Sequence, residues 1–177
     1  MPGERHSAFR GLRIIGMAGL LMLALPGNAQ VVVHWAYGPF GTPGDAAFVV
    51  QDGRVYQASG SFGGLGPCIW VVEEDQVFHA ADTFGKRGTT AFFMEGPDKL
   101  VRCSGYACQR GSCALVREGN KVFRAEGAFC TKAEGAFVID SDLIYLAEGP
   151  FATRGDAILT VDGELRPIEL LAILAGL

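Results

Sequence analysis

An aromatic residue returns about every 22 positions along most of this chain, and this repeat limits the possible folds more than any other feature. The six positions are Phe40, Phe62, Phe84, Tyr106, Phe129 and Phe151. Composition does not account for them, because aromatic residues make up only 10% of the sequence. A glycine stands four residues after most of these aromatics, with slips of one or two places in the fourth and fifth copies. A fixed period of this length indicates a repeat architecture, here with six copies.

Each copy is predicted to form one β-hairpin. Its first apolar run, such as residues 47–50, is too short for a helix and is rich in β-branched and aromatic types. A turn follows, and Asp52-Gly53 is typical of type I′ because both central residues need positive φ. The return run, such as residues 55–58, alternates between the two faces of a sheet. A longer connection over residues 59–67 then leads to the next hairpin.

The repeat begins in the middle of a hairpin, since residues 31–36 match the second half of a unit. Including this strand, the fold class is all-β with about twelve short antiparallel strands in six tandem hairpins. An open or solenoid-like hairpin array is the leading arrangement. Alternation between odd and even units adds a second period of about 44 residues, which makes a β-trefoil the first alternative. A closed barrel or propeller is the other, and it requires the first strand to pair with the last unit.

The units resemble the hairpin repeats of the MORN and WG kinds in length and in having one turn glycine and one aromatic residue per copy. This resemblance is one of architecture, and it implies no function.

Residues 1–29 have the pattern of a secretory signal peptide. Three arginines precede an apolar run over residues 14–25, and Gly27 and Ala29 supply the small residues of a cleavage site. The apolar run is too short to span a membrane. We therefore expect a hairpin-repeat domain over residues 30–166, periplasmic or secreted, with no transmembrane span in the mature chain.

The charge of the mature chain argues against nucleic acid as a partner. Residues 1–29 hold three of the 15 basic residues and one of the 19 acidic ones, so their removal leaves a net charge of about −6. The basic residues are scattered along the hairpins, and no surface is expected to attract a phosphate backbone.

The last segment, residues 167–177, breaks the hairpin pattern. Pro167 is suited to the first turn of a short helix, and the residues after it are largely apolar. This segment is expected to be an apolar cap over the last repeat. A docking element for another subunit is the alternative.

Five cysteines lie in the mature part of the chain, where an oxidising compartment makes disulfides the default. The predicted pairs are Cys108 with Cys130, in matching loops of consecutive units, and Cys103 with Cys113, across one connection. Cys68 is left over, and it is interpreted as a buried small hydrophobe or, alternatively, as a free reactive thiol or one half of an intermolecular bridge. The spacing of the cysteines does not match a zinc site, and no metal or cofactor is expected.

Catalytic patterns are sparse. Only two histidines follow residue 29, and no nucleophile elbow, phosphate loop or paired-histidine motif accompanies them. The frame Phe-x-Thr-x-Gly-Asp-Ala occurs twice and offers weak candidates for ligand binding, namely Thr42, Asp45, Thr153 and Asp156. Such side chains bind sugar hydroxyls or calcium, or they hydrogen-bond the backbone of their own loop.

Two functional hypotheses follow, and an enzyme is the weaker third. The first is a non-enzymatic secreted or periplasmic binding module, with carbohydrate as the ligand of its repeated inter-hairpin loops. The second is a structural or interaction protein of the cell envelope, which associates with itself or with another envelope protein through sheet edges or the apolar C-terminus.

Overall fold

The computed structural model describes residues 30–105 and 107–177. The predicted signal peptide over residues 1–29 lies outside the described residues. The elements are β1 (Val31–Tyr37), β2 (Thr42–Gln51), β3 (Arg54–Ser59), β4 (Gly64–Glu73), β5 (Gln76–Ala80), β6 (Arg87–Met94), β7 (Lys99–Ser104), β8 (Gln109–Glu118), β9 (Lys121–Glu126), β10 (Thr131–Asp140), β11 (Leu143–Glu148), β12 (Thr153–Asp162) and α1 (Pro167–Ala175).

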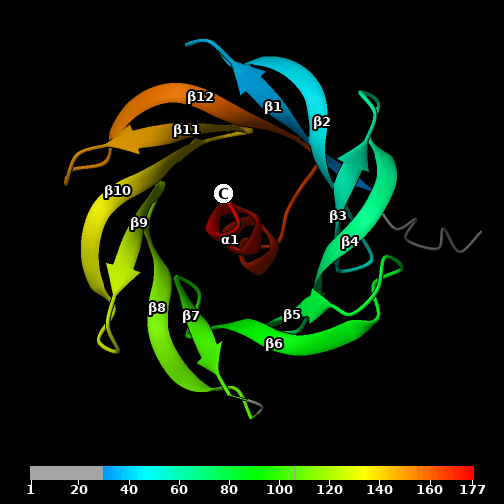
Figure 1. The fold of residues 1–177 in the computed structure, drawn as a ribbon. Coiled ribbons are helices and arrows are strands. Elements are labelled where there is room, and N and C mark those ends of the chain that lie inside the picture. Colours follow the sequence, from blue (N-terminus) through cyan, green and yellow to red (C-terminus); the bar gives the residue numbers. More distant parts are fainter. Residues whose placement is uncertain (1–29, 106) are drawn as a thin grey trace, which may run out of the picture.

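All twelve of these strands lie in one closed, ring-like sheet (Figure 1). Each strand runs antiparallel to its neighbours in the sequence, so that hairpin follows hairpin around the ring. Residues 32–35 of β1 pair with residues 159–162 of β12, and the two ends of the sheet therefore meet. The described strands leave no free edge, which removes the risk of edge-to-edge association that an open array carries.

The predicted all-β hairpin repeat is confirmed, whereas the leading arrangement was wrong. An open or solenoid-like array would leave β1 and β12 unpaired, and a β-trefoil would not place twelve strands in sequence order around one ring. The closed alternative is the one that the pairing of β1 with β12 produces. Each hairpin has the same local pattern in an open and in a closed array, so the repeat alone did not distinguish them.

The strands that begin the hairpins are longer than predicted. Most have ten residues, because the stretch predicted as a long connection is itself mostly strand. For example, β3 continues to Ser59 and β4 already starts at Gly64. Register shifts on both sides of Tyr56 interrupt the pairing of these two strands. Such a bulge bends the hairpin and increases its twist.

The repeated glycine of the sequence lies in this bulged region, where two strands approach closely. A Cβ atom at Gly66 would lie 2.5 Å from the carbonyl oxygen of Gln57. One at Gly88 would lie 2.7 Å from the carbonyl oxygen of His79. No side chain fits at these distances, so the bulge requires glycine at both positions.

Helix α1 occupies the centre of the ring (Figure 1). Its residues Leu171 and Ala172 are completely buried, and the core around them contains buried residues from every one of the twelve strands. Side chains alone fill the interior of a ring of about eight strands, and twelve strands enclose a wider space. A helix, which is about 10–12 Å across with its side chains, fills that space.

The C-terminal segment was expected to cap the last repeat, and in the structure it lies inside the ring. Helix α1 contacts β4, β5, β7 and β8, and Pro167 and Leu170 at its start line a hollow together with Ile144 and Val161 of the last repeat. Ile168, Leu171, Ile173 and Leu174 are all buried against the ring, so the apolar side chains proposed for docking are already in use.

The start of α1 is held by Arg166 and Glu169. The backbone N–H of Arg166 donates to one carboxylate oxygen of Glu169 at 2.9 Å, and its guanidinium donates to the other at 2.7 Å. Glu169 is buried, and a buried carboxylate needs such partners to offset the loss of its hydration. Pro167 occupies the first turn, as predicted for a helix that starts here.

Candidate functional site

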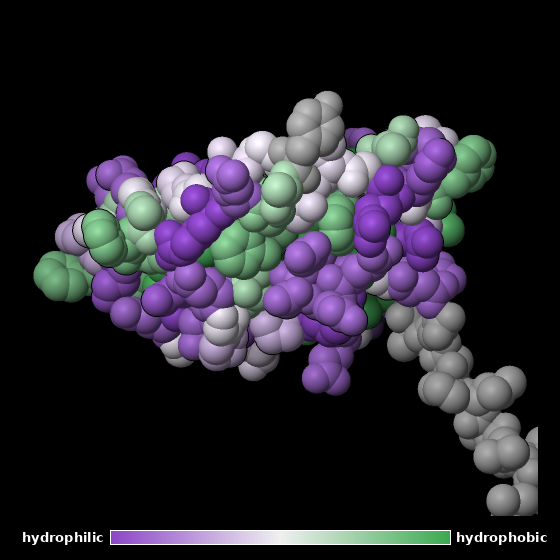
Figure 2. Space-filling model, turned by 90° about the horizontal axis from the view of Figure 1, so that it is seen from below, coloured by the Kyte–Doolittle hydropathy of each residue, from purple (hydrophilic) through white to green (hydrophobic). Residues whose placement is uncertain are grey.

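The six connections that precede β2, β4, β6, β8, β10 and β12 lie around the outer edge of the ring (Figure 1). Five of them carry an almost completely exposed phenylalanine: Phe40, Phe62, Phe84, Phe129 and Phe151 have exposed fractions between 80% and 99%. In the side view of Figure 2, apolar residues form separate patches between polar ones, including at the outermost edges. We call these five phenylalanines the rim phenylalanines.

Each rim phenylalanine lies in a tight turn and directly precedes a small residue with left-handed backbone. In the second copy the N–H of Gly63 donates to the carbonyl oxygen of Gly60 at 3.4 Å, and Gly63 has a φ of +73°. Cys130 and Ala152 occupy the same place in later copies and also have positive φ. Gly63, Cys130 and Ala152 are all buried, so each turn points its small residue inward and its phenylalanine outward.

Three of the turns are bonded to a strand earlier in the chain. Arg54 at the start of β3 donates to the carbonyl oxygen of Gly85 at 3.3 Å, and Lys121 at the start of β9 donates to that of Phe151 at 2.7 Å. Arg110, at a different repeat position on β8, donates to the carbonyl oxygen of Ala128. These contacts fix the turns in place, so the exposed rings stand on an ordered support.

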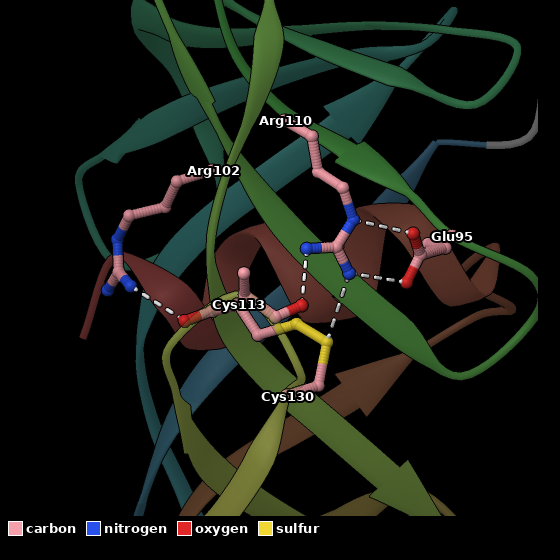
Figure 3. Close-up of a disulfide and its surroundings, with 6 residues drawn as sticks. Glu95, Arg102, Arg110, Cys113 and Cys130 are labelled. Carbon is pink, nitrogen blue, oxygen red and sulfur yellow. Dashed lines mark hydrogen bonds and ion pairs between the residues drawn. A yellow bond between two sulfur atoms is a disulfide. The ribbon is translucent and has the colours of Figure 1, made fainter.

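The structure contains two disulfides, Cys103–Cys108 and Cys113–Cys130, and the predicted pairing was wrong. The first bridge closes one connection on itself. The second joins a turn to the preceding hairpin, and Arg110 lies beside it, bonded to Glu95 (Figure 3). The prediction assumed that matching loops of consecutive hairpins lie side by side. In the structure, the turn that holds Cys130 packs instead against β8 of the preceding hairpin.

Repeated ion pairs connect neighbouring hairpins close to the turns. They are Arg87–Glu73, Arg110–Glu95, Lys132–Glu118 and Arg154–Asp140, with N–O distances of 2.8 to 2.9 Å. The hydrogen bonds from Arg110 hold the pKa of the Glu95 carboxyl below its ordinary value. Three of the cations also lie over an aromatic ring of the adjacent odd-numbered strand. These four basic residues beside the turns are therefore already paired, and such exposed pairs contribute little to stability.

The ligand-binding candidates from the sequence lie on neighbouring hairpins. Thr42 and Asp45 are at the start of β2, and Thr153 and Asp156 are at the start of β12; all four are exposed. Because β1 separates these two strands and pairs with both, the two copies of the frame meet where the ring closes. Each pair follows a rim phenylalanine, so these polar groups and two exposed rings belong to one part of the rim.

The histidines offer no catalytic arrangement. His34 faces the carbonyl oxygen of Gly44 at 3.2 Å, and the ring of His79 lies 4.8 Å from that of Trp70. Neither His79 nor Asp45 lines any of the three main hollows of the described chain. Among residues 30–105 and 107–177, no group of three or more histidine, cysteine, aspartate or glutamate side chains is placed to hold a metal ion.

One hollow of about 280 Å³ lies between the C-terminal end of α1 and strands β7 to β10. Arg102 and Arg124 line it, together with Leu115, Phe137 and Leu174. These arginines are the third residues of their return runs, and the sequence did not mark them as site residues. Their signal was that two consecutive hairpins carry arginine where the earlier ones carry Gln57 and His79.

Cys68 is the free cysteine of the described chain, and it is buried. Burial raises the pKa of its thiol, and the neighbouring Arg54 offsets only part of this effect. Less thiolate is then present near neutral pH, and it is poorly accessible. We expect iodoacetamide to label Cys68 at pH 8 at least about 100-fold more slowly in the native protein than in 6 M guanidinium chloride, as followed by mass spectrometry. Equal rates in the two states would contradict the buried position.

No family model, no curated protein and no solved structure matches this chain. Within the described residues, no helix has the length and apolar character needed to cross a membrane. The candidate function therefore depends on the geometry of this chain itself.

Proposed function

We propose that this protein is a non-catalytic, periplasmic or secreted binding module that attaches to glycans through the turns at the outer edge of its ring. The observation that carries the proposal is the set of rim phenylalanines, each at least 80% exposed on a turn that is fixed to the ring. An exposed phenylalanine contributes nothing to a core, and five in equivalent positions form a repeated apolar contact surface.

The chemistry of these turns suits a sugar. The flat face of a phenylalanine ring packs against the apolar face of a sugar ring. Nearby carboxylates accept hydrogen bonds from sugar hydroxyls, and nearby hydroxyl groups both donate and accept them. Thr42 and Asp45 supply such groups beside Phe40, and Thr153 and Asp156 supply them beside Phe151. Several weak contacts on one rigid ring add up to useful avidity for a repeating polymer.

Charge favours a neutral glycan over a polyanion. The mature chain carries a net charge of about −6, and the basic residues next to four of the turns are paired with acidic ones. This pairing and the net negative charge disfavour binding of nucleic acid or of another phosphate polymer.

Two disulfides support the proposed location, because such bonds persist mainly in oxidising compartments. The predicted signal peptide at residues 1–29 points to the same route.

Association with itself or with another envelope protein is the alternative function. Free sheet edges and the apolar C-terminus were the contacts expected for it, but the described sheet is closed and the helix is buried. The rim phenylalanines are then the surface that such an association would use, so the same variants test both functions.

Replacing Phe62, Phe84 and Phe129 together by serine is expected to reduce glycan binding at least about tenfold, because three of the repeated contacts are lost. A glycan array identifies a bound sugar, and calorimetry then gives the affinity. The melting temperature should change little, since exposed residues contribute little to stability. Leu65→Ser is the control, because Leu65 is exposed but lies outside the turns. Absence of binding to every glycan, together with assembly that depends on protein concentration, would replace the proposed function by self-association.

A further inference from the structure

The hollow at the C-terminal end of α1 lies beside a change in the repeat. Phe48, Trp70, Phe92 and Phe137 occupy one register on their strands, each opposite the third residue of a return run. Leucine stands in that register on the two other strands, as Leu115 on β8 opposite Arg124 and as Leu159 on β12 opposite Trp35. Leu115 is the one that lies near the C-terminal end of α1, and it lines the hollow of about 280 Å³.

Two arginines flank the same position. Arg102 lies on β7 and Arg124 on β9, the two strands on either side of β8. One N–H of Arg102 donates to the carbonyl oxygen of Cys113 at 3.0 Å (Figure 3). Neither guanidinium takes part in an ion pair among residues 30–105 and 107–177. Glu126 is the one acidic residue in the lining, so the two arginines outnumber it.

The rest of the lining is apolar. It consists of Phe137, of small and aliphatic side chains on the wall, and of the end of α1 with the residue beyond it: Ala114, Leu115, Ala125, Ala136, Leu174, Ala175 and Leu177. A pocket with an apolar body and a few convergent polar groups at its mouth is typical of a small-molecule site. Guanidinium groups are well suited to a carboxylate, which they bind through two parallel hydrogen bonds.

We propose that this hollow is a binding site for a small anionic amphiphile, a carboxylate with a short hydrocarbon body. The body packs between Leu115 and the end of α1, and the carboxylate lies between Arg102 and Arg124. The site is separate from the rim phenylalanines, and its occupation does not depend on the glycan-binding function.

Octanoate is a suitable probe, and octan-1-ol has the same chain without the charge. In NMR titrations of the purified protein, octanoate is expected to shift the signals of Leu174 and Ala175 saturably, with a Kd below about 1 mM, as fits a ligand of this size. Octan-1-ol should bind at least tenfold more weakly. Leu115→Phe, which restores the aromatic residue of the neighbouring strands, should abolish the shifts. Arg124→Gln should weaken octanoate binding at least fivefold and leave octan-1-ol unaffected.

Phe62→Ser serves as the control, since Phe62 lies at the outer edge, and its titration should match that of the unchanged protein. Absence of saturable shifts at Leu174 and Ala175 would overturn the site, as would unchanged octanoate binding in Leu115→Phe. Equal affinities for octanoate and octan-1-ol would overturn the role of the arginines. Because Leu115→Phe only restores a residue type that the adjacent strands tolerate, the folded state of each variant can be verified from its remaining signals.

Discussion

Replacing Leu171 by alanine is expected to lower the free energy of unfolding by about 2–5 kcal/mol, the range measured when a buried leucine is truncated and a cavity remains. Leu171 is completely buried on α1, in a core to which all twelve strands contribute. The surrounding strands are closed into a ring, so they have little freedom to move inward and fill the cavity. Urea denaturation followed by circular dichroism measures the change.

Leu177→Ala is the matched control, since Leu177 lies just beyond the same helix and is 46% exposed. Its effect should stay within about 0.5 kcal/mol, as is usual for surface substitutions. Similar small effects of both substitutions would show that the buried Leu171 side chain adds little to the stability of the ring. That result would contradict the view that a twelve-stranded sheet needs the helix to fill its interior.

The sequence was sufficient to predict the strands and turns, because each copy repeats the same local signals. Asp52 and Gly53, for instance, both have positive φ, as a type I′ turn requires. The exposed rim also has a sequence signal, in the six aromatics at one repeat position. Sequence patterns of this kind report which residues share a face or a turn, and they work here because the contacts are local.

Closure of the ring was not predictable in the same way. It depends on the pairing of β1 with β12, two strands more than 100 residues apart, and on a helix wide enough to support the ring. The helical segment was found from Pro167 and its apolar residues, but no local pattern placed it in the centre. The hollow beside Leu115 was missed for a related reason, because it exists only where one wall residue of the repeat meets the end of that helix.

The disulfide pairing was likewise not predictable from local patterns. It also shows that two positions of the repeat, 17 residues apart, lie close together. Cys113 and Cys130 are 17 residues apart, and they join a bulge position on one strand to the left-handed position of the following turn. Cys68 and Gly85 stand at these two positions in an earlier pair of hairpins, also 17 residues apart. A Cβ atom on Gly85 would lie 3.2 Å from the Sγ of Cys68 and 2.6 Å from the Cδ of Arg54, whose flexible side chain would have to move away.

Gly85→Cys is therefore expected to form a third disulfide, with Cys68. The third bridge should add about 3 kcal/mol to the free energy of unfolding, because a bridge over a loop of about 15 residues restricts the unfolded chain by that amount. The left-handed backbone at position 85 costs about 1–2 kcal/mol with any side chain, and Cys108 and Cys130 already adopt it in this protein. Thermal unfolding with and without reductant measures the gain on oxidation, in which this cost cancels. Reductant also opens Cys103–Cys108 and Cys113–Cys130, so the gain of a matched variant that lacks the third bridge is subtracted.

Gly63→Cys is the matched control for this bridge. Gly63 has the same place in its turn and the same left-handed backbone, but the position that corresponds to Cys68 holds Ala46. This variant should keep two free thiols, at positions 63 and 68, and its stability should not depend on oxidation of a nearby partner. Gly85→Cys should have none when assayed with Ellman's reagent in guanidinium chloride. Two free thiols in Gly85→Cys after air oxidation would show that its turn does not pack on the preceding hairpin in the way that the turn of Cys130 does. The view that the rim phenylalanines are held in fixed positions would then also be contradicted, because it depends on the packing of their turns against earlier strands.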